Sequence, residues 1–417
     1  MRQQIEGSRA VAEMVARCRP EVVCAYPISP QTHIIEAVGA MVRSGRLAPC
    51  EFINVESEFA AMSVAIGASA TGARAYTATA SQGLLFMMEA VYNAAGLGLP
   101  VVMTLANRAV GAPINIWNDH SDAMAARDAG WVQLFAEDNQ HAADLHPVAF
   151  RLAEELSVPV MVCMDGFILT HAFEEVDLPQ QDAVDRFLPP FEPRQVLDPD
   201  EPVSIGAMVG PEAFAEVRYL AHVRHLEVSR RLPELLDEYE SVMGRRPPGP
   251  VSPYRLEGAD TVVVAMGSVL GTTKDAVDEL RDSGERIAVL GITAFRPFPA
   301  EAVREALAGM RRVVVLEKAF STGFGGVLST DVAMALSGLG PRVHTVVAGL
   351  GGRPITRESL MRALSAADHD QIAAVSFLDL DRDAVDREMV RMATRRRSGP
   401  SAENLLRDLT RRRPGTV

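Results

Sequence analysis

Residues Glu51 to Glu89 read EFINVESEFAAMSVAIGASATGARAYTATASQGLLFMME, and this stretch decides the predicted fold. Phe52–Val55 is a short apolar run typical of a strand, and Ala75–Ala80 is a second such run after the turn at Gly72. Between them, small apolar residues recur at helical spacing: Ala61, Val64, Ala65 and Ala68. The stretch therefore predicts a strand, a helix and another strand in succession, as in an α/β sheet.

Polar residues stand directly after both of these strands. Glu56 and Glu58 follow the first strand, and Ser81-Gln82-Gly83 opens a further helix after the second. Polar groups at strand ends are typical of a site at the carboxyl edge of an α/β sheet. An acid in the first turn of a helix ordinarily complements the helix dipole. Taken alone, Glu58 is therefore either a helix-stabilising acid or a functional carboxylate.

The same alternation extends outward on both sides of this stretch. Short apolar runs predict strands at Glu21–Ala25, Leu99–Ala106, Gly130–Phe135 and Val158–Met164. Periodic runs predict helices at Gly7–Arg17, Gln31–Leu47 and Asp144–Leu156. Strands that alternate with helices indicate an α/β fold, with a mostly parallel sheet and helices on both of its faces.

The segment Tyr26-Pro27-Ile28-Ser29-Pro30 lies between the strand Glu21–Ala25 and the helix that follows it. Its two prolines hold it extended. Ser29 and Pro30 fit the N-cap and the first position of that helix. Ser29 is thus either an ordinary cap or a hydroxyl that holds a small anion, such as a carboxylate, at a helix N-terminus.

A long polar loop from Asn107 to Asp122 follows the strand Leu99–Ala106. Loops of this length that carry Arg, Asn, Asp and His are usually functional. Arg108 stands at the strand end, where it can bind a carboxylate through two parallel hydrogen bonds or form a structural ion pair. His120 alone is better explained as a hydrogen-bonded loop residue than as a base or a ligand.

A second α/β unit is expected after a boundary at Gly244–Pro250, where glycine and proline concentrate. Before that boundary, Leu178–Pro211 reads as a linker or arm, and Ala213–Met243 as a long charged helix. From Ala259 onward strands and helices alternate again, with strands expected at Thr261–Met266, Arg286–Ile292, Arg312–Glu317 and Val343–Val347. The chain is expected to be helical from Arg357, and its tail carries basic runs at Arg395–Arg397 and Arg411–Arg413.

Composition excludes several classes of function. The chain has 417 residues, 48% of them hydrophobic, and a net charge of -13, which argues against nucleic acid as a partner. No apolar run is long enough to cross a membrane, and the N-terminus lacks the apolar segment of a signal peptide. The four cysteines (Cys18, Cys24, Cys50 and Cys163) form no Cys-x-x-Cys pair, so neither an iron–sulfur cluster nor structural zinc is expected. A cytoplasmic protein is expected.

Five motifs in unbroken order carry a resemblance to a known family. They are Tyr-Pro-Ile-Ser-Pro-Gln-Thr, Val-Glu-Ser-Glu-Phe-Ala, Thr-Ala-Ser-Gln-Gly-Leu, Asn-Arg-Ala and Asn-Asp-His-Ser-Asp. The Arg-Pro-Phe-Pro turn at residues 296–299 and Gly-Leu-Gly-Gly-Arg at residues 349–353 match as well. The chain resembles the α subunits of pyruvate:ferredoxin oxidoreductases, within the 2-oxoacid:ferredoxin oxidoreductase family, over residues 1 to 365.

The resemblance implies a division of the chain into three parts. Residues 1–245 would be a pyrimidine-binding domain for thiamine diphosphate, ending in a helical arm. Residues 256–365 would be a transketolase C-terminal-like domain that serves assembly. Residues 366–417 would be a helical basic tail.

The resemblance also implies roles for particular residues. Glu58 would be the catalytic acid, hydrogen-bonded to the pyrimidine N1′ of thiamine diphosphate so that the cofactor can lose its thiazolium C2 proton. Ser81 and Gln82 would bind the cofactor with it. Arg108 and Ser29 would contact the substrate carboxylate, and Tyr26, Pro27 and Ile28 would line the same pocket. Ser29 stands where the family typically has threonine, which leaves a slightly roomier pocket. No residue of this chain is assigned to a metal.

Partners are implied because the chain lacks half of the expected machinery. It contains no Gly-Asp-Gly motif, so a β subunit would hold the diphosphate through Mg²⁺ and carry a 4Fe–4S cluster, and γ and δ functions would be separate or fused chains. The implied reaction converts a 2-oxoacid, CoA and oxidised ferredoxin into acyl-CoA, CO₂ and reduced ferredoxin, or the reverse. The alternatives are another 2-oxoacid such as oxalate or a branched-chain acid, a non-redox thiamine diphosphate decarboxylase or transketolase half, and an inactive scaffold subunit.

Overall fold

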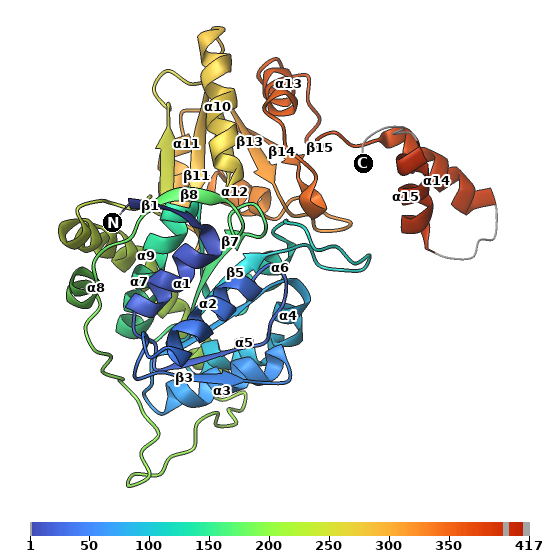
Figure 1. Ribbon diagram of the computed structural model, residues 1–417. Helices are drawn as coiled ribbons and strands as arrows, with labels where there is room; N and C mark the ends of the chain where they lie inside the picture. Colours follow the sequence, from blue (N-terminus) through green and yellow to red (C-terminus); the bar gives the residue numbers. More distant parts are fainter. Residues whose placement is uncertain (1, 395–399, 412–417) are drawn as a thin grey trace.

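The computed structural model describes residues 2–394 and 400–411. Figure 1 shows two α/β units in contact and a pair of helices that projects away from them. Within the described residues, one sheet has seven strands and a second sheet has six. The expected architecture, mostly parallel sheets with helices on both faces, is confirmed.

The seven-stranded sheet forms the body of the first unit. Its strands lie in the order β12, β6, β7, β5, β4, β2 and β3, and all neighbours are parallel except β12 and β6. Their bounds are β12 Ala294–Arg296, β6 Val132–Phe135, β7 Val160–Asp165, β5 Val102–Asn107, β4 Ala75–Thr79, β2 Val22–Ala25 and β3 Glu51–Asn54. Because the central strands β4, β5 and β7 are buried along their whole length, they read as continuous apolar runs in the sequence.

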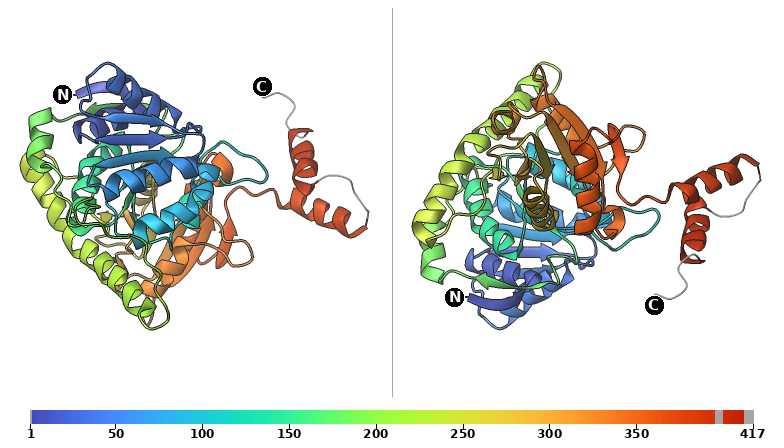
Figure 2. Two further views of the ribbon diagram at one scale, coloured as in Figure 1. Left: turned by 90° about the horizontal axis from the view of Figure 1, so that it is seen from below. Right: turned by 90° about the horizontal axis from the view of Figure 1, so that it is seen from above.

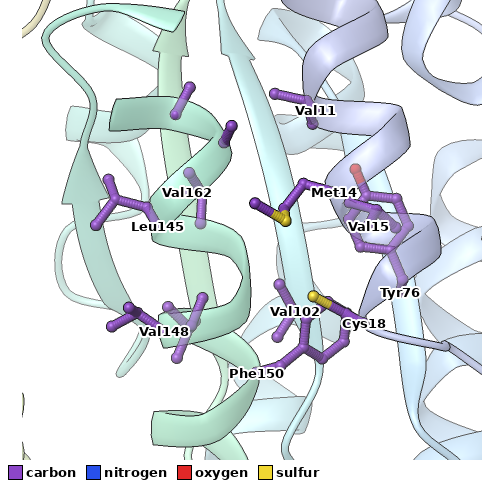
Figure 3. Packing of buried hydrophobic residues seen from close by; sticks show 14 of the residues in the cluster. Val11, Met14, Val15, Cys18, Tyr76, Val102, Leu145, Val148, Phe150 and Val162 are labelled. Atoms are coloured by element: carbon purple, nitrogen blue, oxygen red, sulfur yellow. The ribbon is translucent and has the colours of Figure 1, made fainter. Parts of the chain in front are cut away.

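Helices cover both faces of this sheet. One face carries α1 Gly7–Arg17, α2 Thr32–Arg43 and α7 Asn139–Leu156, with α8 Gln181–Phe187 and α9 Phe214–Met243 packed outside them. The other face carries α3 Glu58–Ala70, α4 Ser81–Phe86 and α5 Met88–Gly96. Figure 3 shows the core of the first face, where side chains of α1 (Val11, Met14, Val15) and α7 (Leu145, Val148) meet those of β5 and β7 (Val102, Val162).

The six-stranded sheet forms the second unit. Its strands lie in the order β15, β14, β13, β10, β11 and β9, and only β9 is antiparallel to its neighbour. Their bounds are β15 Val375–Phe377, β14 Arg342–Val347, β13 Arg312–Glu317, β10 Thr261–Ala265, β11 Ile287–Ile292 and β9 Val251–Tyr254. Helices α10 Val269–Asp282 and α13 Arg357–Asp368 cover one face, and α11 Ala300–Leu307 and α12 Leu328–Ala335 lie on the other.

The two units share structure that the sequence analysis treated as separate. Strand β12 follows the second unit's β11, yet it pairs with β6 of the first sheet. A single apolar cluster also runs between the two sheets and includes Trp131 and Phe135 from the first unit and Phe295 and Val303 from the second. The second unit is therefore fixed against the first, next to the ends of β5 and β7.

The N-terminal residues form a strand that the sequence analysis did not predict. Strand β1, Arg2–Glu6, pairs antiparallel with β8, Phe173–Asp177. Its side chains are mostly exposed and polar, so the sequence lacks the apolar signal of a buried strand. The pair brings the N-terminus beside the turn that follows β7.

Two boundaries differ from those predicted near the first helix. Helix α2 begins at Thr32, so Ser29 is not its N-cap and Pro30 is not its first residue. The chain first makes a turn, in which the Gln31 backbone N–H donates to Ile28 O at 2.9 Å. The Gln31 side chain is buried and donates to Tyr26 O at 3.1 Å and Ala78 O at 2.7 Å. The bond to Ala78 O ties Gln31 to β4, and Ser29 lies in the turn before the helix.

The end of the chain also differs from the prediction. Residues from Arg357 onward are not all helical, because β15 at Val375–Phe377 adds an edge strand to the second sheet. Beyond it, α14 Arg382–Thr394 and α15 Ser401–Arg411 form the projecting pair, which all three views show apart from both sheets (Figure 1, Figure 2). The basic runs at residues 395–397 and 412–413 lie outside the described residues.

Among the helices that the structure describes, none combines the length and the apolar character needed to cross a membrane.

Candidate active site

Glu58 is the first residue of α3 and lies in a nearly closed position. Ser57 caps the helix by accepting a hydrogen bond from Ala60 N, so the helix begins just after β3. The Glu58 side chain is held at a helix N-terminus, and the residue is 8% exposed. Within the described part of the chain, its carboxylate has no hydrogen-bond or ion-pair partner. The described residues thus leave this carboxylate free, and it is available to a ligand that the chain itself does not supply.

Gly83 allows the start of α4 to pack directly against the Glu58 side chain. A Cβ atom at Gly83 would meet Glu58 Oε1 at 2.8 Å and Thr79 Oγ1 at 2.5 Å. Two buried polar atoms without partners among the described residues lie at neighbouring strand ends, Thr79 Oγ1 on β4 and Asn107 Oδ1 on β5. Such groups are ordinarily satisfied in a folded protein. Unpaired polar atoms at two adjacent strand ends support a polar ligand at this edge of the sheet.

Asp122, in α6 Ser121–Ala125, joins the separate strand ends into one site. Its Oδ2 accepts the backbone N–H of Ser81 and of Arg108, both at 3.0 Å, and its Oδ1 accepts Asn107 Nδ2 at 2.9 Å. Burial raises the pKa of Asp122 to about 7, although these hydrogen bonds act in the opposite direction. The side chain therefore fixes the loop after β5 against the start of α4.

Arg108 has hydrogen-bond donors that no described residue uses, and these donors could bind an anion. It is 6% exposed, and burial lowers the pKa of its guanidinium although Asp122 opposes that shift. Its Nε donates to Asn115 O at 2.9 Å and its Nη1 to Ser29 O at 3.0 Å. In the described chain it makes no salt bridge, and Nη2 has no acceptor. A buried guanidinium with free donors is suited to a planar carboxylate.

The residues before α2 form an open rim beside Arg108. Tyr26 is 39% exposed, Pro27 and Ser29 are also exposed, and Ile28 is half-buried. The bond from Arg108 to the Ser29 carbonyl joins this rim to the loop after β5. The structure thus brings together all four rim residues and Arg108, while leaving the rim uncovered by this chain.

Ser81 and Gln82 differ in whether their polar side-chain atoms remain free to bind a ligand. Ser81 is fully buried, and its hydroxyl is hydrogen-bonded to Ala109 O at 2.6 Å and to the Gln82 side chain. Gln82 is half-buried and lies against Gly111, where a Cβ would meet Gln82 Nε2 at 2.6 Å. Gln82 therefore has the freer amide, and Ser81 serves mainly to hold the turn.

The second unit holds the long loop after β5 through its glycine segment η1, Leu350–Gly352. Asn115 Nδ2 donates to Gly351 O at 3.1 Å, and Gly351 N donates to Asp119 Oδ2 at 2.9 Å. A Cβ at Gly352 would meet the Trp117 Cβ at 2.3 Å, and the φ of Gly352 is +79°. We call this contact between residues 349–353 and residues 115–119 the glycine clamp. It positions Asn115, whose carbonyl in turn binds Arg108.

Asp165 at the end of β7 ties the units together, and the sequence analysis did not single it out. It accepts His120 Nε2 and Lys318 Nζ, both at 2.7 Å, and Ser268 N at 3.0 Å. Burial acts to raise the pKa of Asp165, but Lys318 and His120 outweigh burial and hold it well below its usual range. The sequence did contain a signal for Asp165, because this acid stands directly after the predicted apolar strand Val158–Met164. His120 is the hydrogen-bonded loop residue that the sequence analysis favoured.

Family models match two stretches of the chain. Residues 13–235 match the model described as "Pyruvate flavodoxin/ferredoxin oxidoreductase, thiamine diP-bdg". Residues 259–360 match the model described as "Pyruvate:ferredoxin oxidoreductase core domain II". The first match covers the unpartnered Glu58 and Arg108, and the second covers the glycine clamp.

Curated relatives cover almost all of the chain. A protein named pyruvate synthase subunit PorA from Methanosarcina barkeri is 49% identical over 86% of this chain and 91% of that protein. A protein named ketoisovalerate oxidoreductase subunit VorA from Pyrococcus horikoshii is 38% identical over 91% of this chain and 96% of that protein. The two relatives are named for different 2-oxoacids.

Solved structures share the fold. A 2-oxoglutarate:ferredoxin oxidoreductase from Magnetococcus marinus, solved with 2-oxoglutarate, coenzyme A and succinyl-CoA bound, has a TM-score of 0.67 at 20% identity, and the match covers 88% of this chain and 65% of that one. A split-gene transketolase has a TM-score of 0.52 at 17% identity, covering 89% of this chain and all of that one. The expected fold class, a pyrimidine-type domain with a transketolase-like second domain, is confirmed.

Proposed function

This chain belongs to the pyruvate flavodoxin/ferredoxin oxidoreductase family, and we propose that it is the α-type subunit of a thiamine diphosphate-dependent pyruvate:ferredoxin oxidoreductase. The enzyme converts pyruvate, CoA and oxidised ferredoxin into acetyl-CoA, CO₂ and reduced ferredoxin, or runs in reverse. One observation carries the proposal. Among the described residues, the Glu58 carboxylate and one Arg108 nitrogen, Nη2, have no partner; Glu58 lies against Gly83 of α4, and Asp122 binds the backbone N–H groups of both Ser81 in α4 and Arg108.

The residues present fit the pyrimidine half of thiamine diphosphate. Glu58 has the burial and the free carboxylate needed to hydrogen-bond the pyrimidine N1′, and its contact with Gly83 fixes it beside α4. When bound, the cofactor would supply a carbon nucleophile, at thiazolium C2, for the 2-oxoacid. Glu58 holds the proton at N1′ that makes this possible. Gln82 contacts the cofactor from α4, and Ser81 fixes the turn that presents Gln82.

Arg108 and the rim are proposed to bind the substrate. Arg108 Nη2 has no acceptor among the described residues and would pair with the substrate carboxylate, and the Ser29 hydroxyl would make a further contact with it. Tyr26, Pro27 and Ile28 line the apolar side of the pocket. Pyruvate is favoured because the relative of highest identity given above is a pyruvate synthase subunit. A branched-chain acid is the second candidate, since a relative named for ketoisovalerate covers as much of the chain.

Partner subunits complete the proposed enzyme. A β subunit binds the diphosphate through Mg²⁺ and carries a 4Fe–4S cluster, γ and δ functions add coenzyme A-linked steps and further clusters, and ferredoxin accepts the electrons. The exposed rim supports a site between subunits. Within this chain we propose residues 1–245 as the pyrimidine-binding domain, 256–365 as the transketolase-like domain and 366–417 as a tail. The four cysteines are free, which supports action in the cytoplasm.

The glycine clamp gives a first prediction about this site. Gly352→Ala places a Cβ against Trp117 at a positive φ, so the loop must move and carry Asn115 with it. Because a displacement of about 1 Å can cost up to about 100-fold, we expect kcat/KM for the 2-oxoacid to fall by at least about tenfold, mainly through KM. Steady-state kinetics of the assembled enzyme measure this. Gly340→Ala is the matched control, because its Cβ meets nothing within 4 Å; equal kinetics in both variants would contradict the role of the clamp.

The proposed function is tested with the chain and whatever subunits its host attaches to it. We expect the purified complex to contain iron and to reduce a low-potential dye under anaerobic conditions only when pyruvate and CoA are both present. A substrate panel of pyruvate, 2-oxoglutarate, oxalate and a branched-chain 2-oxoacid identifies the preferred acid. Decarboxylation by an iron-free complex would favour a non-redox thiamine enzyme. No dye reduction with any of these acids, by a complex that carries its iron, would contradict the proposal.

A further inference from the structure

Three side chains that could bind a metal meet on the surface of the first unit. Glu6 ends β1, His33 lies in the first turn of α2, and His171 lies in the turn between β7 and β8. One ligating atom from each residue lies within 4.8 Å of the other two. Three segments far apart in the sequence thus converge on one point, and neither the sequence motifs nor the proposed reaction accounts for it.

The geometry of the two rings suits a shared ion. The His33 and His171 rings lie 4.7 Å apart between centroids and are tilted by 34°, so they stand side by side. His33 Nδ1 and Glu6 Oε1 are 2.7 Å apart. Neighbouring ligands of a tetrahedral zinc are separated by about 3.3 Å, given Zn–N and Zn–O bonds of about 2.0–2.1 Å. A small rotation of the exposed His33 side chain would widen the Nδ1–Oε1 separation to this value.

Hydrogen bonds to Thr170 already orient the His171 ring. Its Nδ1 is hydrogen-bonded to Thr170 Oγ1 at 2.7 Å, and Thr170 Oγ1 accepts the backbone N–H of Phe167 at 2.8 Å. Binding the second ring nitrogen in this way fixes the ring and leaves Nε2 as the ligand, as in known metal-bound histidines. The cluster also remains reachable from solvent, since the side chains of His33 and Glu6 are 50% and 23% exposed.

We propose that Glu6, His33 and His171 bind one zinc ion, with water in the fourth position. Two imidazoles and one carboxylate with an open position form a set that zinc accepts. The competing interpretation is a surface pair of Glu6 and His33 beside a stacked ring. A simple ion pair of Glu6 and His33 would not explain why His171 lies beside them, or why Thr170 orients the His171 ring.

The position of the site gives the ion a structural role beside the substrate rim. A row of four rings runs from His33 through His171 and Phe167 to Trp117, with centroid separations of 4.7, 4.8 and 4.9 Å. Trp117 lies in the glycine clamp, and His33 lies four residues after Ser29. An ion at the near end of this row would fix β1, α2 and the β7–β8 turn together. It would thereby hold in place the rim residues before α2 and, through the row of rings, Trp117 in the glycine clamp.

Zinc binding is tested directly on the full-length chain. After treatment with a chelator, titration with zinc chloride by calorimetry is expected to show one tight site per chain and a rise in Tm. Co²⁺ in place of zinc is expected to give the visible absorption of a low-coordinate N/O site. His33→Ala and His171→Ala are each expected to weaken binding by more than about 100-fold. Glu6→Gln keeps the shape of the side chain and is expected to weaken binding as well.

The controls keep the test decisive. His222→Ala removes an exposed histidine on α9 and is expected to bind zinc as the unsubstituted chain does. Circular dichroism establishes that each variant is folded before titration. Absence of a stoichiometric site in the unsubstituted chain would overturn the proposal. So would a site that persists unchanged in both His33→Ala and His171→Ala.

Discussion

Glu58→Gln is expected to remove most of the activity of the assembled enzyme, with kcat falling by about 10²- to 10⁴-fold while the chain folds normally. The magnitude is that of a positioned acid or base lost from a reaction. Glutamine keeps the size of the side chain and its place at the start of α3, but it cannot share a proton with the cofactor. Because Glu58 has no partner in the described chain, the substitution breaks no bond that the fold needs.

The measurement is the steady-state rate of pyruvate- and CoA-dependent dye reduction, with bound thiamine diphosphate quantified in the same preparation. Glu56→Gln is the matched control, because Glu56 lies two residues earlier and is exposed. It is expected to retain nearly full activity. Turnover close to normal in Glu58→Gln, with the cofactor bound, would reject the catalytic role of Glu58.

Arg108→Lys is expected to raise the KM for the 2-oxoacid by about 10- to 100-fold, while cofactor binding changes little. Lysine keeps the charge but loses the planar fork, and a hydrogen bond to a charged group is worth about 1.5–3 kcal/mol. The shorter reach also releases the bonds from Arg108 to Ser29 O and Asn115 O. Substrate saturation curves of the assembled enzyme measure the effect.

Arg127→Lys is the control for this prediction, since the Arg127 side chain is 40% exposed and pairs only loosely with Asp128 at 3.7 Å. Its KM is expected to be unchanged. If Arg108→Lys saturates with substrate as the unsubstituted enzyme does, the substrate carboxylate is bound elsewhere.

Local patterns in the sequence predicted most elements of both units. The long charged helix, expected at Ala213–Met243, is observed at Phe214–Met243, and the strand expected at Arg312–Glu317 has those bounds. Such segments have a buried stripe or a continuous apolar run, which is a property of the segment itself. The N-cap assignment of Ser29 was wrong because Gln31 bonds to Ala78 on another strand, which no local pattern contains.

The contacts between the units could not be predicted, because they join residues far apart in the chain. The pairing of β12 with β6, the glycine clamp and the bonds of Asp165 to Lys318 and Ser268 all depend on how two sheets meet. The sequence analysis assigned no metal ligand in this chain, because the features it considered were cysteine spacing, His120 and the missing Gly-Asp-Gly motif. A cluster drawn from Glu6, His33 and His171 has no spacing to detect.

The central claim is that this chain activates thiamine diphosphate through Glu58. The most direct measurement is the rate at which solvent deuterium replaces the thiazolium C2 proton of the bound cofactor, followed by NMR after acid quenching of the assembled complex. We expect fast exchange in the unsubstituted enzyme and in Arg108→Lys, and exchange slowed by about 100-fold or more in Glu58→Gln. Exchange at the unsubstituted rate in Glu58→Gln would contradict the account.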